Sequence, residues 1–86
     1  MGFKIETGYH NGTLSIDITP ERNADQYQYA YYLMNFSGDA VEKRGYSKQQ
    51  HCVFSIPEKG KYRVLYYVME DQNKYSFLSE YTDCQE

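Results

Sequence analysis

The order of apolar and polar residues divides this chain into short stretches that alternate from one position to the next. Because neighbouring side chains of a β-strand point to opposite faces, such alternation predicts strands with one buried face. Turn-forming residues bound seven such stretches: 3–7, 14–18, 27–36, 41–46, 51–56, 62–69 and 75–81. Short strands at regular spacing are typical of sandwiches, so we predict an all-β, seven-stranded antiparallel sandwich.

Turn chemistry agrees with this division of the chain. Asn11 and Gly12 lie between the first two stretches, and both residue types tolerate the positive φ angles of a tight hairpin turn. A longer polar connection begins at Thr19 and Pro20 and has the length needed to cross between two sheets. We assign residues 1–82 to a single domain and residues 83–86 to a polar tail or linker remnant.

The segment between Pro57 and Tyr62 is the most specific local feature. Pro57 and Gly60 form a turn, and Tyr62 stands near the start of the strand that follows. In a tyrosine corner, a buried ring at this place sends its hydroxyl back to upstream backbone. We therefore expect Pro57, Gly60 and Tyr62 to form a structural corner of an immunoglobulin or fibronectin III-like sandwich.

Strand register assigns the side chains of two long strands to two faces. The expected core-facing residues are Tyr29, Tyr31, Leu33, Tyr62, Val64 and Val68. The period-two rule sends the intervening residues to the outer face of the same sheet: Tyr32, Met34, Leu65, Tyr67 and Met69. This face is unusually apolar. Two interpretations stay open: an interaction platform, or cross-strand pairs that stabilise the sheet or are covered by residues 41–46.

Composition and charge limit the partners. The 86 residues include 11 Tyr, no Trp and 2 Pro, a bias toward residue types that favour strands. The formal net charge is −3 with scattered Lys and Arg, so nucleic acid is not an expected partner. No apolar run approaches the roughly 20 residues that cross a bilayer, so membrane insertion is not expected either.

The two cysteines, Cys52 and Cys84, do not make the dense disulfide framework of a small secreted protein. Cys52 falls on a core-facing position, whereas Cys84 falls in the expected tail. We expect one buried thiol and one tail thiol. A disulfide between them is the alternative, and the compartment stays open because two cysteines are compatible with either redox environment.

Motifs of catalysis are absent from the sequence. It has no Gly-rich phosphate loop, no His-Glu-x-x-His zinc motif and no nucleophile elbow. His51 and Cys52 are adjacent, but consecutive strand residues point to opposite faces and so cannot converge as a dyad. We therefore predict a protein that is not an enzyme, with no catalytic residues, no metal site and no cofactor.

The middle of the chain resembles the triple-tyrosine domain of bacterial proteins. The resemblance is carried by the run Tyr-Ala-Tyr-Tyr-Leu at 29–33, the turn at Gly38 and Asp39, and the blocks 54–57 and 60–64. It covers a little over half of the chain. It implies a small fibronectin-like sandwich of the kind found beside β-propellers in the sensor regions of hybrid two-component regulators, and also in some polysaccharide-processing proteins.

The function that this resemblance implies is that of a non-catalytic accessory module in a larger bacterial protein at the cell envelope. Such a module serves protein–protein interaction, spacing or signal transmission, with other domains of the parent chain, a protein partner or a second copy as partners. The alternative is a carbohydrate-binding module attached to a glycan-processing enzyme. The chain departs from the family pattern at Tyr46, where a Trp usually follows the turn.

Overall fold

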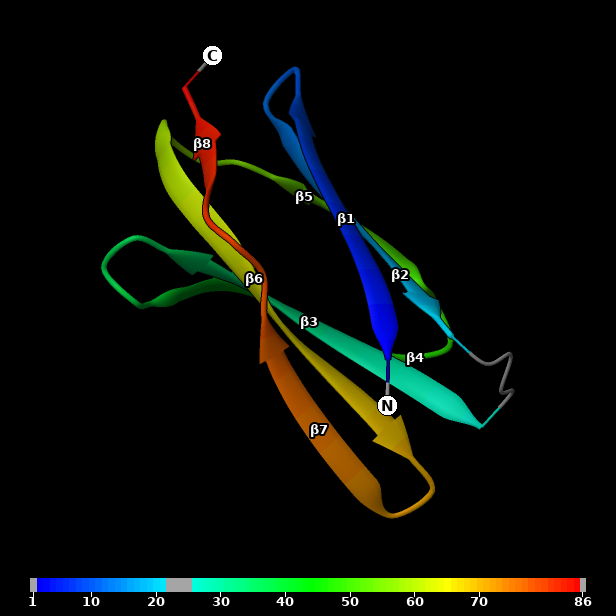
Figure 1. Cartoon of the computed structure of the whole chain (residues 1–86). Coiled ribbons are helices and arrows are strands. Elements are labelled where there is room, and N and C mark those ends of the chain that lie inside the picture. Colours follow the sequence, from blue (N-terminus) through cyan, green and yellow to red (C-terminus); the bar gives the residue numbers. More distant parts are fainter. Residues whose placement is uncertain (1, 22–25, 86) are drawn as a thin grey trace.

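The computed structural model describes residues 2–21 and 26–85, and every regular element among them is a β-strand (Figure 1). The strands are β1 (Phe3–His10), β2 (Thr13–Pro20), β3 (Tyr27–Asn35), β4 (Ala40–Ser47), β5 (His51–Ser55), β6 (Gly60–Glu70), β7 (Asn73–Leu78) and β8 (Thr82–Cys84). They form two antiparallel sheets, of three and five strands, packed as a sandwich. The predicted all-β sandwich is confirmed, but the described residues form eight strands rather than seven.

The smaller sheet has the strand order β1-β2-β5. Strands β1 and β2 form a hairpin, in which Phe3 pairs with Pro20 and His10 with Thr13. Asn11 and Gly12 turn this hairpin with φ angles of 52° and 76°. Positive φ at both central positions is what a type I′ turn requires, so the tight turn predicted for this pair is present.

The larger sheet has the order β4-β3-β6-β7, with β8 also paired to β6. The long strand β6 runs beside β3 along one edge, and beside β7 and β8 along the other. Strand β7 pairs with residues 65–70 of β6, and β8 pairs with residues 60–62. Strands β7 and β8 are therefore two parts of one edge strand that is interrupted at residues 79–81.

The predicted polar tail is corrected by this arrangement. Thr82, Asp83 and Cys84 pair with Tyr62, Lys61 and Gly60, and the side chain of Cys84 is completely buried. A three-residue strand is too short to display an alternating pattern, so its polar sequence looked like a tail. Residue 85 follows the strand, and residue 86 lies outside the described residues.

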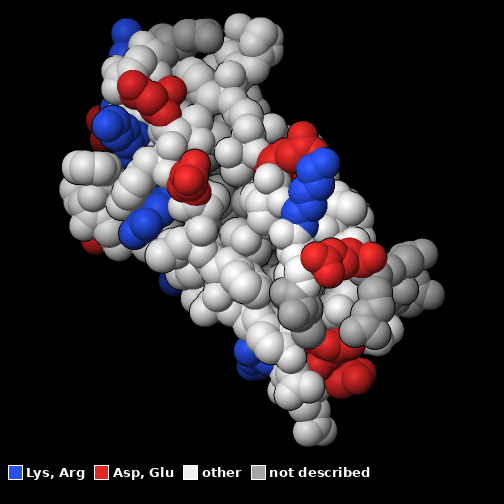
Figure 2. Space-filling model, in the orientation of Figure 1, with Lys and Arg blue, Asp and Glu red and all other residues white. Residues whose placement is uncertain are grey.

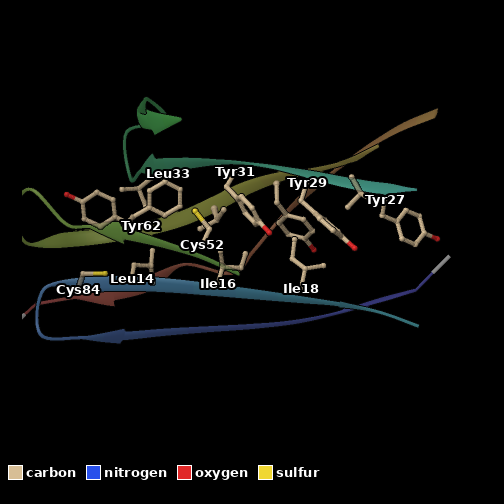
Figure 3. Packing of buried hydrophobic residues seen from close by; sticks show 14 residues of the cluster. Leu14, Ile16, Ile18, Tyr27, Tyr29, Tyr31, Leu33, Cys52, Tyr62 and Cys84 are labelled. Carbon is tan, nitrogen blue, oxygen red and sulfur yellow. The ribbon is translucent and has the colours of Figure 1, made fainter. Parts of the chain in front are cut away.

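Aromatic side chains fill a large part of the core between the two sheets (Figure 3). On β3, every second residue points inward, and its tyrosines meet aliphatic side chains of β2. The buried cluster consists of Leu14, Ile16, Ile18, Tyr27, Tyr29, Tyr31, Leu33, Cys52, Phe54, Tyr62, Val64, Tyr66, Val68 and Cys84. All six residues predicted to face the core belong to this cluster.

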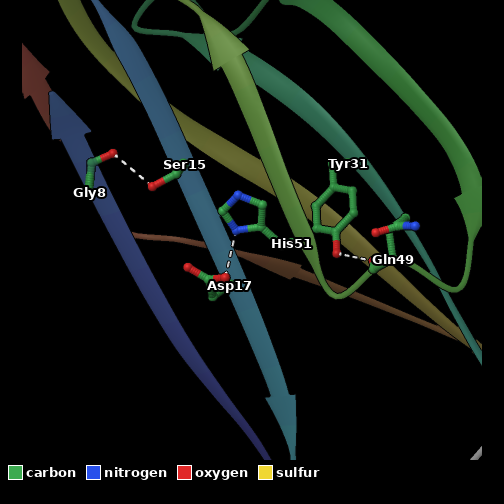
Figure 4. A network of polar contacts seen from close by, with 6 residues as sticks. All are labelled: Gly8, Ser15, Asp17, Tyr31, Gln49 and His51. Atoms are coloured by element: carbon green, nitrogen blue, oxygen red, sulfur yellow. Dashed lines mark hydrogen bonds and ion pairs between the residues drawn. The ribbon is translucent and has the colours of Figure 1, made fainter. Parts of the chain in front are cut away.

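A buried tyrosine hydroxyl usually needs a hydrogen-bond partner. Two buried tyrosines of β3 differ in whether they have one. The hydroxyl of Tyr31 donates a hydrogen bond of 2.6 Å to the carbonyl of Gln49 (Figure 4). The hydroxyl of Tyr29 is buried without a hydrogen-bond partner among the described residues. Burial raises the pKa of Tyr29, and the nearby side chain of Gln50 offsets only part of this rise.

This difference predicts opposite effects for the same chemical change. Tyr31→Phe leaves the Gln49 carbonyl without its donor, so we expect a loss of about 1 kcal/mol in the free energy of unfolding. Tyr29→Phe removes a buried hydroxyl that makes no hydrogen bond among the described residues, so we expect stability unchanged or increased by about 1 kcal/mol. Urea denaturation of both variants checks the signs. A Tyr29→Phe variant as destabilised as Tyr31→Phe would contradict the interpretation.

The structure contains the hydrogen bond expected of a tyrosine corner. The ring of Tyr62 is 4% exposed, and its hydroxyl donates to the carbonyl of Glu58 at 2.7 Å. Pro57 lies exposed in the turn before this contact, and Gly60 is the first residue of β6. The three predicted corner residues therefore lie within one turn and the strand it opens.

Removing the hydroxyl of the corner should weaken the fold. We expect Tyr62→Phe to lower the free energy of unfolding by about 1 kcal/mol or more, because the Glu58 carbonyl loses its donor. Thermal denaturation followed by circular dichroism measures the change. A melting curve that coincides with the wild-type curve would show that the corner contributes nothing to stability.

Both cysteines are free and buried, Cys52 in β5 and Cys84 in β8. The expectation of one buried and one tail thiol is therefore wrong for Cys84, and no disulfide joins the pair. Burial is the largest cause that raises the pKa of each thiol. Both are consequently protonated at neutral pH, the form in which a thiol is a poor nucleophile.

Candidate functional site

The five residues predicted for the outer face of the larger sheet all lie on its surface, each partly exposed. Residues paired directly across two strands share a face, and the β3–β6 register pairs Tyr32 with Leu65 and places Tyr67 opposite Ala30. Met34 and Met69 lie near the two ends of the same strip, opposite Arg63 and Gln28. The period-two assignment of faces therefore agrees with the burial of these two strands.

The two tyrosines of this strip contact each other and are partly covered by their own chain. The ring centroids of Tyr32 and Tyr67 are 5.2 Å apart at an interplanar angle of 68°, an edge-to-face arrangement. The Lys43 ammonium lies 5.0 Å from the centroid of the Tyr32 ring. The contact agrees with the cross-strand interpretation, because the two rings come from the paired strands β3 and β6. Each ring also keeps some exposed surface, and the interaction platform stays a prediction.

A β-bulge in β4 adds a third tyrosine to this face. Tyr29 pairs with Ser47 and Tyr31 with Arg44, so β4 has one residue more than β3 between these two pairs. The ring centroid of Tyr46 lies 6.5 Å from that of Tyr67. Strict alternation missed this residue. The available signal was Gly45, because a glycine inside a strand often marks a bulge.

The three tyrosine rings surround a hollow of about 400 Å³ on the sheet surface. The other residues that line it are Ala30, Gly45, Lys74, Tyr75 and Ser76. Ala30 is 3% exposed, although it faces outward, so the larger side chains around it enclose it. Ala30 therefore forms the covered base of the hollow, and a ligand would meet the side chains around it.

The hydroxyl of Tyr46 is influenced by the other two rings of the hollow. The pKa of Tyr46 is raised, first by burial and then by the nearby phenol groups of Tyr67 and Tyr32. The Tyr46 phenol is therefore neutral at physiological pH and can both donate and accept hydrogen bonds.

Further aromatic and aliphatic side chains lie on the outer face of the larger sheet near Leu65 and Arg63 of β6. The alternating pattern of the sequence did not predict them as part of this face. Leu78 of β7 pairs with Leu65 and is half exposed. In the segment that separates β7 from β8, the ring of Tyr81 lies 4.4 Å from the Arg63 guanidinium and 5.1 Å from the ring of Phe36. The interruption of the edge strand thus places Tyr81 beside β6.

The outer face of the smaller sheet is polar by comparison. His51 Nδ1 lies 2.6 Å from Asp17 Oδ1 across β5 and β2, and the Ser15 hydroxyl donates to the Gly8 carbonyl at 3.4 Å (Figure 4). These groups are exposed, where such contacts contribute little to stability. On the side of the molecule drawn in Figure 2, acidic and basic residues are interspersed without a patch of one sign.

The residues that the structure describes do not bring titratable side chains together into a metal-binding cluster, and the neighbouring His51 and Cys52 point apart. His51 points to solvent and Cys52 into the core, as strand geometry predicts. Residues 2–21 and 26–85 contain no group of three or more His, Cys, Asp or Glu placed to hold a metal ion. The same part of the chain has no helix that is long and apolar enough to cross a membrane.

No model of a known protein family matches this sequence, and no curated protein matches it.

Proposed function

We propose that this domain is a non-catalytic accessory module of a larger protein, built as a fibronectin III-like sandwich. The support is the strand order, with β1, β2 and β5 in one sheet and β4, β3, β6 and β7 in the other. In constant-type immunoglobulin domains the fourth strand joins the first sheet, beside the strand equivalent to β5. Here β4 pairs with β3 in the second sheet, which favours the fibronectin III alternative.

We propose that this domain belongs to the triple-tyrosine family. Residues 29–33, which carry the resemblance, lie in the central strand β3, and Tyr62 of the second block forms the corner contact with Glu58. In this proposal the module belongs to a bacterial protein of the cell envelope. There it keeps neighbouring domains at a fixed spacing or transmits signals between them.

The observation that carries the proposed interaction is the apolar strip on the outer face of the larger sheet. Tyr32, Met34, Leu65, Tyr67 and Met69 run along it, and the half-exposed Leu78 widens it. Large exposed apolar patches bordered by polar residues mark interaction sites, and the centre of a protein interface is more apolar than its rim. We therefore assign this strip to contact with a domain of the parent chain or with a protein partner.

Radical footprinting tests this assignment because it labels Met and Tyr side chains according to their exposure. We expect Met34, Met69 and Tyr67 to be labelled several-fold less in the native full-length polypeptide than in the 86-residue domain. Tyr9, on the smaller sheet, serves as the internal control and should not change. Equal labelling of the strip in both proteins, with no self-association at high concentration, would reject the platform.

Two exposed aliphatic residues provide matched variants for the same test. Leu78 is 51% exposed on the larger sheet, and Val53 is 43% exposed on the smaller one. We expect Leu78→Ser to weaken partner or self-association by about 1 kcal/mol or more while Val53→Ser has no effect. Neither change should alter the melting temperature appreciably.

Carbohydrate binding is a second candidate function, and the hollow between the three tyrosines favours it. A pyranose ring has an apolar face that packs against an aromatic ring and a rim of hydroxyls that needs hydrogen-bond partners. Tyr46 and Tyr67 offer both. Glycan-array binding that disappears in Tyr67→Ala would support this candidate, whereas an array without signal would reject it.

A further inference from the structure

The hollow between Tyr32, Tyr46 and Tyr67 differs in charge from the chain as a whole. Lys74 lines it, and Lys43 lies against the Tyr32 ring, which forms part of its wall. Among the described residues no acidic side chain lines it, although the formal net charge of the chain is −3. An anionic ligand would therefore meet the Lys74 ammonium and no lining carboxylate from this part of the chain, and the positive charge of Lys43 beside Tyr32 adds to the local field.

The geometry of the rings suits a ligand with a flat apolar side. Tyr32 and Tyr67 meet at 68°, and Tyr46 and Tyr67 at 57°, so neighbouring rings form a floor and a wall rather than one flat plane. The Ser76 hydroxyl and the tyrosine phenols provide donors and acceptors around this space. These features together fit a six-membered ring with polar groups at its rim.

We propose that this hollow binds a sugar residue that carries a carboxylate, such as a uronic acid unit of an acidic polysaccharide. The proposal rests on the second candidate function and specifies its ligand. The apolar side of the sugar ring packs against the tyrosines, the ring hydroxyls bond to the phenols, and the carboxylate pairs with Lys74. A charge-assisted hydrogen bond of this kind is roughly twice as strong as one between neutral groups, which makes it the natural source of specificity.

Titration of the isotope-labelled domain with oligomers of galacturonic acid tests the proposal by two-dimensional NMR. We expect shifts at the amides of Ala30, Tyr46, Tyr67 and Ser76, which lie around the hollow. The same oligomer with its carboxylates methyl-esterified keeps the shape and loses the charge, so it should bind about tenfold more weakly. The affinity for the acid should also fall as salt is added.

Two variants and one control separate the contributions. We expect Lys74→Gln to weaken binding of the acid by about three- to tenfold without changing the affinity for the methyl ester. Tyr67→Ala should abolish binding of both. Lys4→Gln alters an exposed lysine of β1 in the smaller sheet and should change neither. Unchanged melting curves establish that the variants are folded.

Each result decides one part of the proposal. Equal affinity for the acid and its methyl ester overturns the acidic specificity but leaves carbohydrate binding in place. Shifts produced equally by acetate, at the concentration of carboxylate in the oligomer, overturn the sugar as the recognised unit. No binding of either oligomer to the folded wild-type domain rejects this inference, whereas the glycan array decides separately whether the domain binds any carbohydrate, and the proposed protein contact keeps its own test.

Discussion

Raising the pH above about 10 should unfold this domain, because its core contains tyrosines that ionise more readily in the unfolded chain. Tyr29, Tyr31, Tyr62 and Tyr66 are each at most 6% exposed, and burial is the largest cause that raises the pKa of each. Burial disfavours the charged phenolate, so the folded state holds the proton more tightly.

The sign of the effect follows from where each state releases its proton. Below about pH 10, the ordinary pKa of tyrosine, both states are protonated and the stability is complete. As the pH rises from about 10 toward the raised folded values, only the unfolded chain ionises, and each buried tyrosine costs at most about 1.4 kcal/mol per pH unit. Over one to two pH units, the summed cost for four such groups approaches the whole free energy of unfolding of a small domain, which is about 5–15 kcal/mol.

Circular dichroism and the ultraviolet absorbance of tyrosinate, recorded along one alkaline titration, check this expectation. Exposed tyrosines should ionise first without loss of sheet signal, and the remaining ones should ionise together with unfolding. Tyr29→Phe should move the unfolding midpoint to higher pH, because it removes one of the groups responsible. A single smooth ionisation of all tyrosines near pH 10, with the sheet signal intact, would contradict the mechanism.

Truncating Phe54 to alanine should destabilise the domain far more than the loss of any single tyrosine hydroxyl. Phe54 is fully buried in β5 and pairs with Leu14, and the guanidinium of Arg44 lies 5.0 Å from its ring centroid. Phe-to-Ala changes in cores cost about 3–5 kcal/mol, from lost burial and from the cavity that remains. At roughly 0.05–0.15 kcal/mol per residue, that is a large share of the stability of a domain of this size.

Chemical denaturation of Phe54→Ala and Phe54→Leu checks the prediction, with Val53→Ala as the control. Val53 is the preceding residue of β5 and points to solvent, so its truncation should change the free energy of unfolding by no more than about 0.5 kcal/mol. Phe54→Leu should fall between the two. Comparable losses for Val53→Ala and Phe54→Ala would mean that the two faces of β5 do not differ in burial.

Much of the fold could be predicted because alternation is a strong signal in strands with one buried face. Tyr29 to Leu33 and Tyr62 to Val68 carry it over several residues, so both the core and the outer strip followed from the sequence. Asn11 and Gly12 marked the hairpin for a different reason, their tolerance of positive φ. The pattern says nothing about sheet order, so the placement of β4 beside β3 needed the structure.

The candidate site was less predictable because irregular features shape it. A bulge in β4 brings Tyr46 to the hollow. The one sequence signal for this bulge was Gly45, a glycine inside a strand. Lys74 of β7 reaches the hollow because β7 pairs with β6, which places Lys74 opposite Met69. The local sequence pattern does not predict which strands pair. Cys84 was misplaced for a related reason: a strand of three residues, held by its neighbour β6, has no periodicity of its own.

The interruption between β7 and β8 gives the domain a mechanical weak point. Strand β8 is held to β6 through Thr82, Asp83 and Cys84, and residues 79–81 separate it from β7. A pull at right angles to β6 on the chain at Cys84 would separate these three pairs one after another, whereas the longer β3–β6 pairing would stay in register. We expect the first detectable extension under load to be release of β8, with Gly60 and Tyr62 losing their neighbours and the thiol of Cys84 becoming reactive.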